Sequence, residues 1–285
     1  MYILLLIAAS IVAATGLLVL GISIRMHKGT SPHALRRLAP IPIEARTHLN
    51  ERIIFFGHKS VGNNIVDGIR DIVASYESLS LNIVETKDVD QIECPMLAHA
   101  QVGRNLDPES KIAEFKMLME GGLAEKVDIA FFKFCYVDIG STSNPDAIVA
   151  KYCKAMNKLK SCYPQVVFVH VTVPLCGPPK KLKGILKSSI KRLIGRPSIL
   201  DDNLVRVRYN ALLRERFSGK EPLFDLALYE TLGPDGLRHY SFRDGREVPI
   251  LVRSYTDDGG HLNVMGRRHM AEQLLIKLLD LASSG

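Results

Sequence analysis

Cysteine is scarce in this sequence, and the cysteines that are present form no recognisable pattern. There is no CxxC pair and no cysteine–histidine grouping with zinc-site spacing. The five lie at irregular intervals, at Cys94, Cys135, Cys153, Cys162 and Cys176. An odd number at such spacings speaks against a disulfide framework, and we expect reduced, mostly buried side chains and no metal site.

Repeats, low-complexity tracts and nucleic-acid-binding motifs are missing as well. The chain has 285 residues, 47% apolar and 24% charged, a composition that suits one large α/β domain and excludes wholesale disorder. Much of its net charge of +7 comes from two basic segments, residues 25–37 and 180–196. Without an RNA or DNA motif, we expect no nucleic-acid partner, and anionic lipid is the favoured partner of these segments.

Charged side chains are also absent from residues 2–24. A helix of this length reaches about 35 Å, enough to cross the hydrocarbon core of a membrane. A cleaved signal peptide usually has basic residues ahead of a shorter apolar run. We therefore expect residues 1–25 to be an uncleaved, single-pass transmembrane anchor. The basic residues that follow predict a cytoplasmic domain by the positive-inside rule, with the exported side as the alternative.

Residues 26–50 show no sustained apolar period and contain several prolines, which predicts a linker. Beyond it, strand-length apolar runs alternate with segments of helical period. We expect strands over 52–57, 79–84, 127–134, 165–173 and 222–226. We expect helices over 61–76, 108–123, 146–162, 201–217 and 262–282.

This alternation predicts an α/β fold, a flavodoxin-like three-layer α/β/α sandwich with a mainly parallel sheet. We expect one domain over residues 51–285, with a basic insertion at 174–200 and a polar loop at 233–254 that has room for a hairpin. Sites in such sheets lie beyond the carboxyl ends of the strands.

Ser60 lies at that end of the first expected strand, just before a helix. A serine there faces the crevice, and the helix N-terminus supplies N–H donors that suit an oxyanion. Two alternatives are open at this point. Ser60 could be a helix N-cap. Gly57 and Gly62 have phosphate-loop spacing, although Asn63-Asn64 stands where such a loop has Lys-Ser/Thr.

Asp258 and His261 lie three residues apart, across a Gly-Gly turn, before the last expected helix. The turn lets the carboxylate fold back onto the imidazole of the same loop. A carboxylate held against Nδ1 fixes the tautomer of the ring and leaves Nε2 free as a base. With Ser60, this pair predicts a catalytic triad.

The serine after the first strand and the Asp-Gly-Gly-His-Leu-Asn block before the last helix resemble blocks of the SGNH/GDSL hydrolase superfamily. The resemblance spans residues 52–279. It implies that Ser60 attacks an ester carbonyl, that His261 is the base and that Asp258 orients it, with no cofactor. It also implies an oxyanion site that includes Ser60 itself and a second-block glycine, for which Gly103 is the best match.

Two departures from the family pattern follow. The first block has Gly-His-Lys-Ser in place of Gly-Asp-Ser, as in some bacterial members, and His58 becomes a candidate substrate contact. The third block lacks its asparagine. Tyr136, Lys133 and Asn105 are the candidates to replace that oxyanion donor, and Lys133 is also a candidate substrate contact.

Residues and resemblance together predict a membrane-anchored serine esterase or acyl hydrolase that forms an acyl-enzyme. Its substrate would be a small-molecule, lipid or carbohydrate ester. A catalytically degenerate binding protein of the same fold is the alternative. Residues 180–196 alternate cations with apolar residues, which is typical of an interfacial helix on anionic lipid, with a lid over the domain as the alternative.

Overall fold

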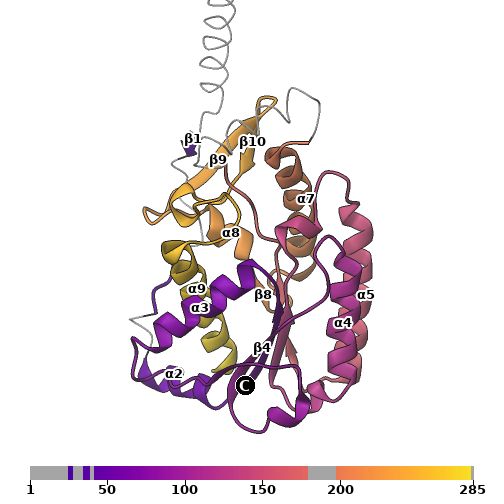
Figure 1. The fold of residues 1–285 in the computed structure, drawn as a ribbon, viewed down its shortest axis with the longest axis vertical. Coiled ribbons are helices and arrows are strands. Elements are labelled where there is room, and N and C mark those ends of the chain that lie inside the picture. The colour runs from indigo at the N-terminus through magenta and orange to yellow at the C-terminus, as the bar shows by residue number, and fades with distance from the viewer. Residues whose placement is uncertain (1–24, 28–34, 39–41, 179–196, 284–285) are drawn as a thin grey trace, which may run out of the picture.

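A five-stranded parallel sheet forms the centre of the molecule (Figure 1). The computed structural model describes residues 25–27, 35–38, 42–178 and 197–283. The strand order is β3-β4-β2-β5-β6. These strands are β2 (Ile53–His58), β3 (Ile83–Glu85), β4 (Met96–Gln101), β5 (Ile129–Phe132) and β6 (Val167–Phe168).

Helices cover both faces of this sheet, so the predicted α/β fold with a parallel sheet is confirmed. One face carries α2 (Ile43–Asn50), α3 (Val61–Val73) and α9 (Val264–Ala282). The other carries α4 (Pro108–Glu120), α5 (Pro145–Cys162) and α7 (Ile199–Phe217). Strand β2 shows why both faces are covered. Phe56 belongs to the first core and Phe55 to the second, because successive side chains of a strand point to opposite faces.

Strand β4 was missed by the sequence analysis. Its residues, Met-Leu-Ala-His-Ala-Gln, include no β-branched side chain, and alanine is depleted in strands. Pairing with β2 on one side and β3 on the other holds it in the sheet. Strand β3 is also shorter than the expected 79–84 and begins only at Ile83; Leu79 and Leu81 ahead of it are buried in the core without belonging to the strand.

A smaller β-structure lies beside the sheet. Strand β7 (His170–Val171) pairs with β8 (Leu223–Phe224), and α8 (Leu226–Thr231) follows. The expected hairpin in the polar loop is formed by β9 (Arg238–Arg243) and β10 (Arg246–Pro249). Strand β1 (Arg25–His27) pairs with β9 on its other edge, at one end of the molecule (Figure 1).

The segment expected to be a linker differs from that expectation. It contains α2, and residues 35–38 lie along α9. The Leu38 side chain is buried, its amide donates to Glu272 at 2.9 Å, and Arg36 pairs with Asp280. Leu38 and Leu49 are isolated apolar residues without a period, so the pattern gave no sign that they join the core.

Within the described ranges, no helix combines the length and apolarity needed to cross a bilayer. The apolar stretch 2–24 and the basic segment 180–196, on which the predicted anchor and lipid contact depend, lie outside the described residues. The insertion expected over 174–200 ends inside α7, whose first residue is Ile199.

Candidate active site

Ser60 lies between β2 and α3, at the carboxyl edge of the sheet. Its backbone has φ 55° and ψ −110°, a conformation that non-glycine residues rarely adopt and that is concentrated at functional sites. The serine side chain makes no capping hydrogen bond to α3, so the N-cap alternative is wrong. Gly57 lies inside the ladder of β2 rather than in a loop, which argues against a phosphate loop.

The side chains of Asp258, His261 and Ser60 form a hydrogen-bonded chain. Asp258 Oδ2 lies 2.6 Å from His261 Nδ1, and His261 Nε2 lies 2.8 Å from Ser60 Oγ. A carboxylate can only accept, so Nδ1 of the ring donates to it. Nε2 of the neutral ring then accepts from the serine hydroxyl. Asp258 and His261 are exposed and Ser60 is half-buried, so the chain is open to a substrate.

The loop around Asp258 keeps the carboxyl group charged. Its Oδ1 accepts backbone hydrogen bonds from Gly260 and His261, each 2.8 Å long. Burial favours the neutral acid, but the hydrogen bonds from the His261 ring and from these two amides outweigh it and lower the pKa of Asp258 to about 2. Gly259 has φ 93°, and a Cβ on Gly260 would come within 2.8 Å of the Tyr136 hydroxyl. Both glycines are therefore required by the geometry of the loop.

Contacts between α3 and α9 bring the two ends of the domain together. Asn64, in the first turn of α3, accepts from the amide of Leu262 at 3.2 Å through its Oδ1. Asp71 further along α3 pairs with Arg267 of α9 at 2.8 Å. These bonds fix the loop that carries His261 against the helix that begins after Ser60.

The depressed pKa of Asp258 predicts an acid-dependent loss of stability. The pKa falls from the ordinary value of 3.8 to about 2 on folding. The charged carboxylate therefore stabilises the folded state above pH 3.8, and this contribution disappears as the pH falls from there to about 2. Urea unfolding of the wild-type chain and Asp258→Asn between pH 3 and pH 7 checks this. The difference in the free energy of unfolding between the wild type and Asp258→Asn should be constant near neutral pH and shrink on acidification. A difference that grows on acidification would contradict the prediction.

His58, expected at the substrate, is instead buried beneath the site. Its Nε2 lies 3.1 Å from His99 Nδ1, and Arg70 Nη2 lies 3.0 Å from His99 Nε2. Arginine only donates, so His99 donates from Nδ1 and His58 accepts. Burial, and then the nearby His99, Lys133 and Arg70, lower the pKa of His58 to about 2, which keeps it neutral. Its expected contact with the substrate is therefore not found.

Lys133 and Gly103 also differ from expectation. The Lys133 side chain is buried, and its Nζ donates to the Phe134 carbonyl at 3.2 Å. Burial is the main cause that lowers the pKa of Lys133. The Gly103 amide donates to Glu114 at 2.7 Å and so is not turned toward an oxyanion in this structure. Neither group is available in the role that the sequence suggested, because both already have partners inside the domain.

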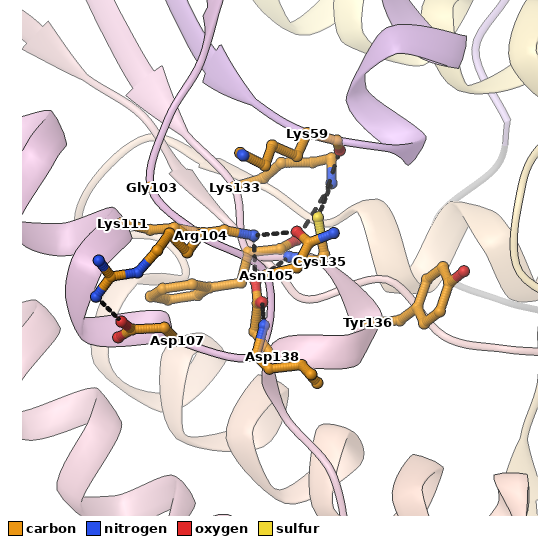
Figure 2. Close-up of polar contacts among 12 residues, drawn as sticks. Lys59, Gly103, Arg104, Asn105, Asp107, Lys111, Lys133, Cys135, Tyr136 and Asp138 are labelled. Carbon is orange, nitrogen blue, oxygen red and sulfur yellow. Dashed lines mark hydrogen bonds and ion pairs between the residues drawn. The ribbon is translucent and has the colours of Figure 1, made fainter.

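Asn105 is held in a defined orientation by a buried ion pair. Lys111 Nζ lies 2.5 Å from Asp138 Oδ2, and both side chains are buried. The same ammonium donates to Asn105 Oδ1 at 3.2 Å, so the Asn105 amide nitrogen points away from it (Figure 2). Asp138 also accepts from the amides of Cys135 and Leu106. The pair thus ties the loop after β5 to the loop after β4.

Lys111 and Asp138 were missed by the sequence analysis. Lys111 lies in the same row of α4 as Phe115 and Met119, four and eight residues further on, and all three are buried. A lysine in an apolar row is the signal that identifies a buried, paired cation.

Tyr136 lies directly beside the imidazole. Its ring centroid is 5.9 Å from that of His261, in an edge-on arrangement. Burial is the main cause that raises the pKa of Tyr136 to about 12, so the hydroxyl keeps its proton and remains a donor. The guanidinium carbon of Arg206 lies 5.8 Å from the centroid of the Tyr136 ring, and Arg206 Nε donates to the Tyr136 carbonyl.

Metal ligands and disulfides are not part of the site as described. Over the described ranges, no three His, Cys, Asp or Glu side chains are grouped so as to hold a metal ion. All five cysteines are free; Cys94 and Cys162 are exposed and the other three are buried.

Solved structures similar to this chain come from the SGNH/GDSL hydrolases and from acetyltransferase domains, at low sequence identity. One is described as a platelet activating factor from Streptococcus pneumonia (14% identity, TM-score 0.46, 83% of this chain and 90% of that chain). Another is assigned to the G-D-S-L lipolytic family in Desulfitobacterium hafniense (9%, 0.43, 80% and 99%). A third is the periplasmic domain of a Salmonella lipopolysaccharide acetyltransferase (9%, 0.44, 81% and 85%).

A scan against family models and a search of curated proteins found no match.

Proposed function

We propose that this chain is a membrane-anchored serine hydrolase that cleaves an acyl or acetyl ester. The observation that carries the proposal is the hydrogen-bonded chain from Asp258 through His261 to Ser60. A serine hydroxyl held against a neutral imidazole, whose other nitrogen donates to a carboxylate, is the arrangement that nucleophilic acyl transfer requires.

The proposed reaction has two steps. Ser60 Oγ attacks the ester carbonyl while its proton passes to His261 Nε2, and the alcohol leaves with that proton, so that an acyl-enzyme remains. Water then gives a proton to His261, attacks the acyl carbonyl and releases the acid, and Oγ regains its proton. Asp258 stabilises the imidazolium that forms in each step.

We assign the oxyanion donors to the Ser60 amide and the Asn105 side chain. Strands β2 and β4 are adjacent and parallel, and their last residues, His58 and Gln101, lie opposite each other. Ser60 and Asn105, which follow these two strands, therefore lie at the same edge of the sheet. The bond from Lys111 occupies Asn105 Oδ1 and leaves Nδ2 as the donor. Asn105 thus supplies the amide that the third block lacks.

Asn105→Ala should lower kcat by about 10²–10³-fold, because one oxyanion donor is removed. The measurement is turnover of an activated ester such as p-nitrophenyl acetate. Arg104→Ala, which removes an exposed neighbouring side chain, is the control and should leave turnover within about twofold. A large loss in Tyr136→Phe combined with normal turnover in Asn105→Ala would refute this assignment in favour of Tyr136.

Exposed apolar side chains that follow Asn105 and His261 closely in the sequence favour a substrate with a long acyl chain. Leu106, directly after Asn105, is 77% exposed. Val264 and Met265, at the start of α9, are 66% and 53% exposed.

A panel of p-nitrophenyl esters with acyl chains of increasing length tests both the proposed hydrolysis and this preference for a long acyl chain. No turnover and no fluorophosphonate labelling of the folded chain would favour the alternative, a degenerate binding protein.

The membrane anchor over residues 1–25 and the cytoplasmic side of the domain are part of the same proposal. They are supported by the uncharged stretch 2–24 and the basic residues after it. Alkaline carbonate extraction of membranes and protease protection of a C-terminal tag test the two statements separately.

A further inference from the structure

A pocket of about 230 Å³ lies where α7, α8 and the β9–β10 hairpin meet. Its polar lining includes Arg214, Asp225 and Arg238, and its apolar lining includes Leu175 and Leu228. No residue of the triad lines it. The hairpin lies at the end of the molecule where β1 is found (Figure 1), and α8 contacts its strand β9.

The negative charge in the pocket is already neutralised. Asp225 accepts two hydrogen bonds from Arg214, to Oδ2 at 2.6 Å and to Oδ1 at 2.7 Å. Its Oδ1 also accepts from the Thr172 hydroxyl and the Leu228 amide. A carboxylate with four donors and a paired guanidinium has little capacity left to pair with a second cation.

Arg238 is the unpaired cation of this pocket. Among the described residues it forms no ion pair, and its Nε is buried without a hydrogen-bond partner. Buried donors in native proteins are nearly always satisfied, so such a group calls for a ligand or another explanation. An anion in the pocket would balance the charge of the Arg238 guanidinium, which lines the pocket and has no carboxylate partner among the described residues.

The positions of the two arginines and the volume of the pocket favour a phosphate group as the anion. Arg214 on α7 and Arg238 on β9 come from different elements, and a phosphate has enough oxygens to accept from both. The volume is below the roughly 300–1,000 Å³ of sites for drug-sized ligands. Arg238 lies opposite His27 of β1, a few residues after the uncharged stretch 2–24.

We propose that this pocket binds a phosphate group, and that its source is either an anionic lipid headgroup or free phosphate. The apolar walls formed by Leu175, Leu228 and Pro249 suit the carbon atoms next to a phosphomonoester. Because the pocket is separate from the triad, the proposal is independent of hydrolysis at Ser60.

Calorimetric titration of the full-length chain in neutral detergent tests this proposal, with inorganic phosphate, dihexanoylphosphatidic acid and acetate as probes. The wild type should bind phosphate saturably and more tightly than acetate. Arg238→Gln should weaken phosphate binding about tenfold or more. Arg246→Gln, which changes an exposed residue of β10 in the same hairpin, should change it by no more than about twofold. Ala227→Leu enlarges a lining side chain and should also block binding, while circular dichroism confirms that each variant is folded.

The probes distinguish the two sources. Tighter binding of dihexanoylphosphatidic acid than of phosphate, lost in Arg238→Gln, identifies a lipid headgroup; equal affinities identify the phosphate group alone. Three results would overturn the proposal: no saturable phosphate binding by the folded wild type, acetate binding as tight as phosphate binding, or equal effects of Arg238→Gln and Arg246→Gln.

Discussion

Ser60→Ala should reduce ester turnover by about 10⁴–10⁶-fold, because the attacking oxygen is removed while the rest of the fold is kept. The hydroxyl donates to His261 and makes no other contact that holds α3 in place. The expected loss is therefore in kcat, with near-normal thermal stability. Hydrolysis of an activated ester and labelling by a fluorophosphonate measure it, and the labelled peptide should contain residue 60.

Ser75→Ala is the matched control for this variant. Ser75 lies just beyond the other end of α3, where its hydroxyl donates to the Asp71 carbonyl at 2.7 Å. The Ser75→Ala variant should keep its ester turnover and fluorophosphonate labelling within about twofold of the wild type. Equal turnover in Ser60→Ala and the wild type would show that hydrolysis takes place elsewhere and would end the proposal of a serine triad.

Lys111→Met should lower the free energy of unfolding by about 3–5 kcal/mol, because it leaves the buried Asp138 carboxylate without its cation. Methionine keeps much of the shape of the side chain, so the effect measures the loss of the ion pair and of the bond to Asn105. Turnover should fall as well, since the Asn105 amide loses the contact that fixes its orientation. Urea unfolding of the full-length chain in detergent, with extrapolation to water, measures the change in stability.

Lys116→Met provides the comparison on the same helix. Lys116 pairs with Glu120 four residues on, but both side chains are about one-third exposed. Such a surface pair contributes about 0.5 kcal/mol or less. Similar losses in the two variants would mean that burial of the Lys111 pair has no special importance for this fold.

The sequence predicted the residues of the candidate triad because local features carry most of the geometry. A strand, a serine and a helix place Ser60 at the sheet edge, and a Gly-Gly turn lets Asp258 reach the imidazole three residues away. The structure brings these groups together as that pattern suggested. The remaining step, contact between residues 60 and 261, followed from the topology of a parallel sheet.

The surroundings of the candidate triad were harder to predict because they depend on burial. His58, the last residue of β2, and Lys133, directly after β5, are polar residues beside the expected site. Both side chains are nevertheless buried, His58 against His99 and Lys133 against the Phe134 carbonyl. The Gly103 amide is bonded to Glu114, a residue of α4 eleven positions away. Sequence spacing identifies which residues are near an edge, but not which way each side chain turns.

Helix α9 connects residues 36–38 with the loop that carries the His261 imidazole. Its 19 residues span about 28 Å. Glu272, near the middle of α9, and Asp280, near its end, hold residues 36–38 along the helix, and His261 lies three residues before its first residue. If the preceding stretch lies in a bilayer, two contacts set the orientation of the crevice toward the lipid surface: the pairing of β1 with β9 and the packing of residues 36–38 along α9.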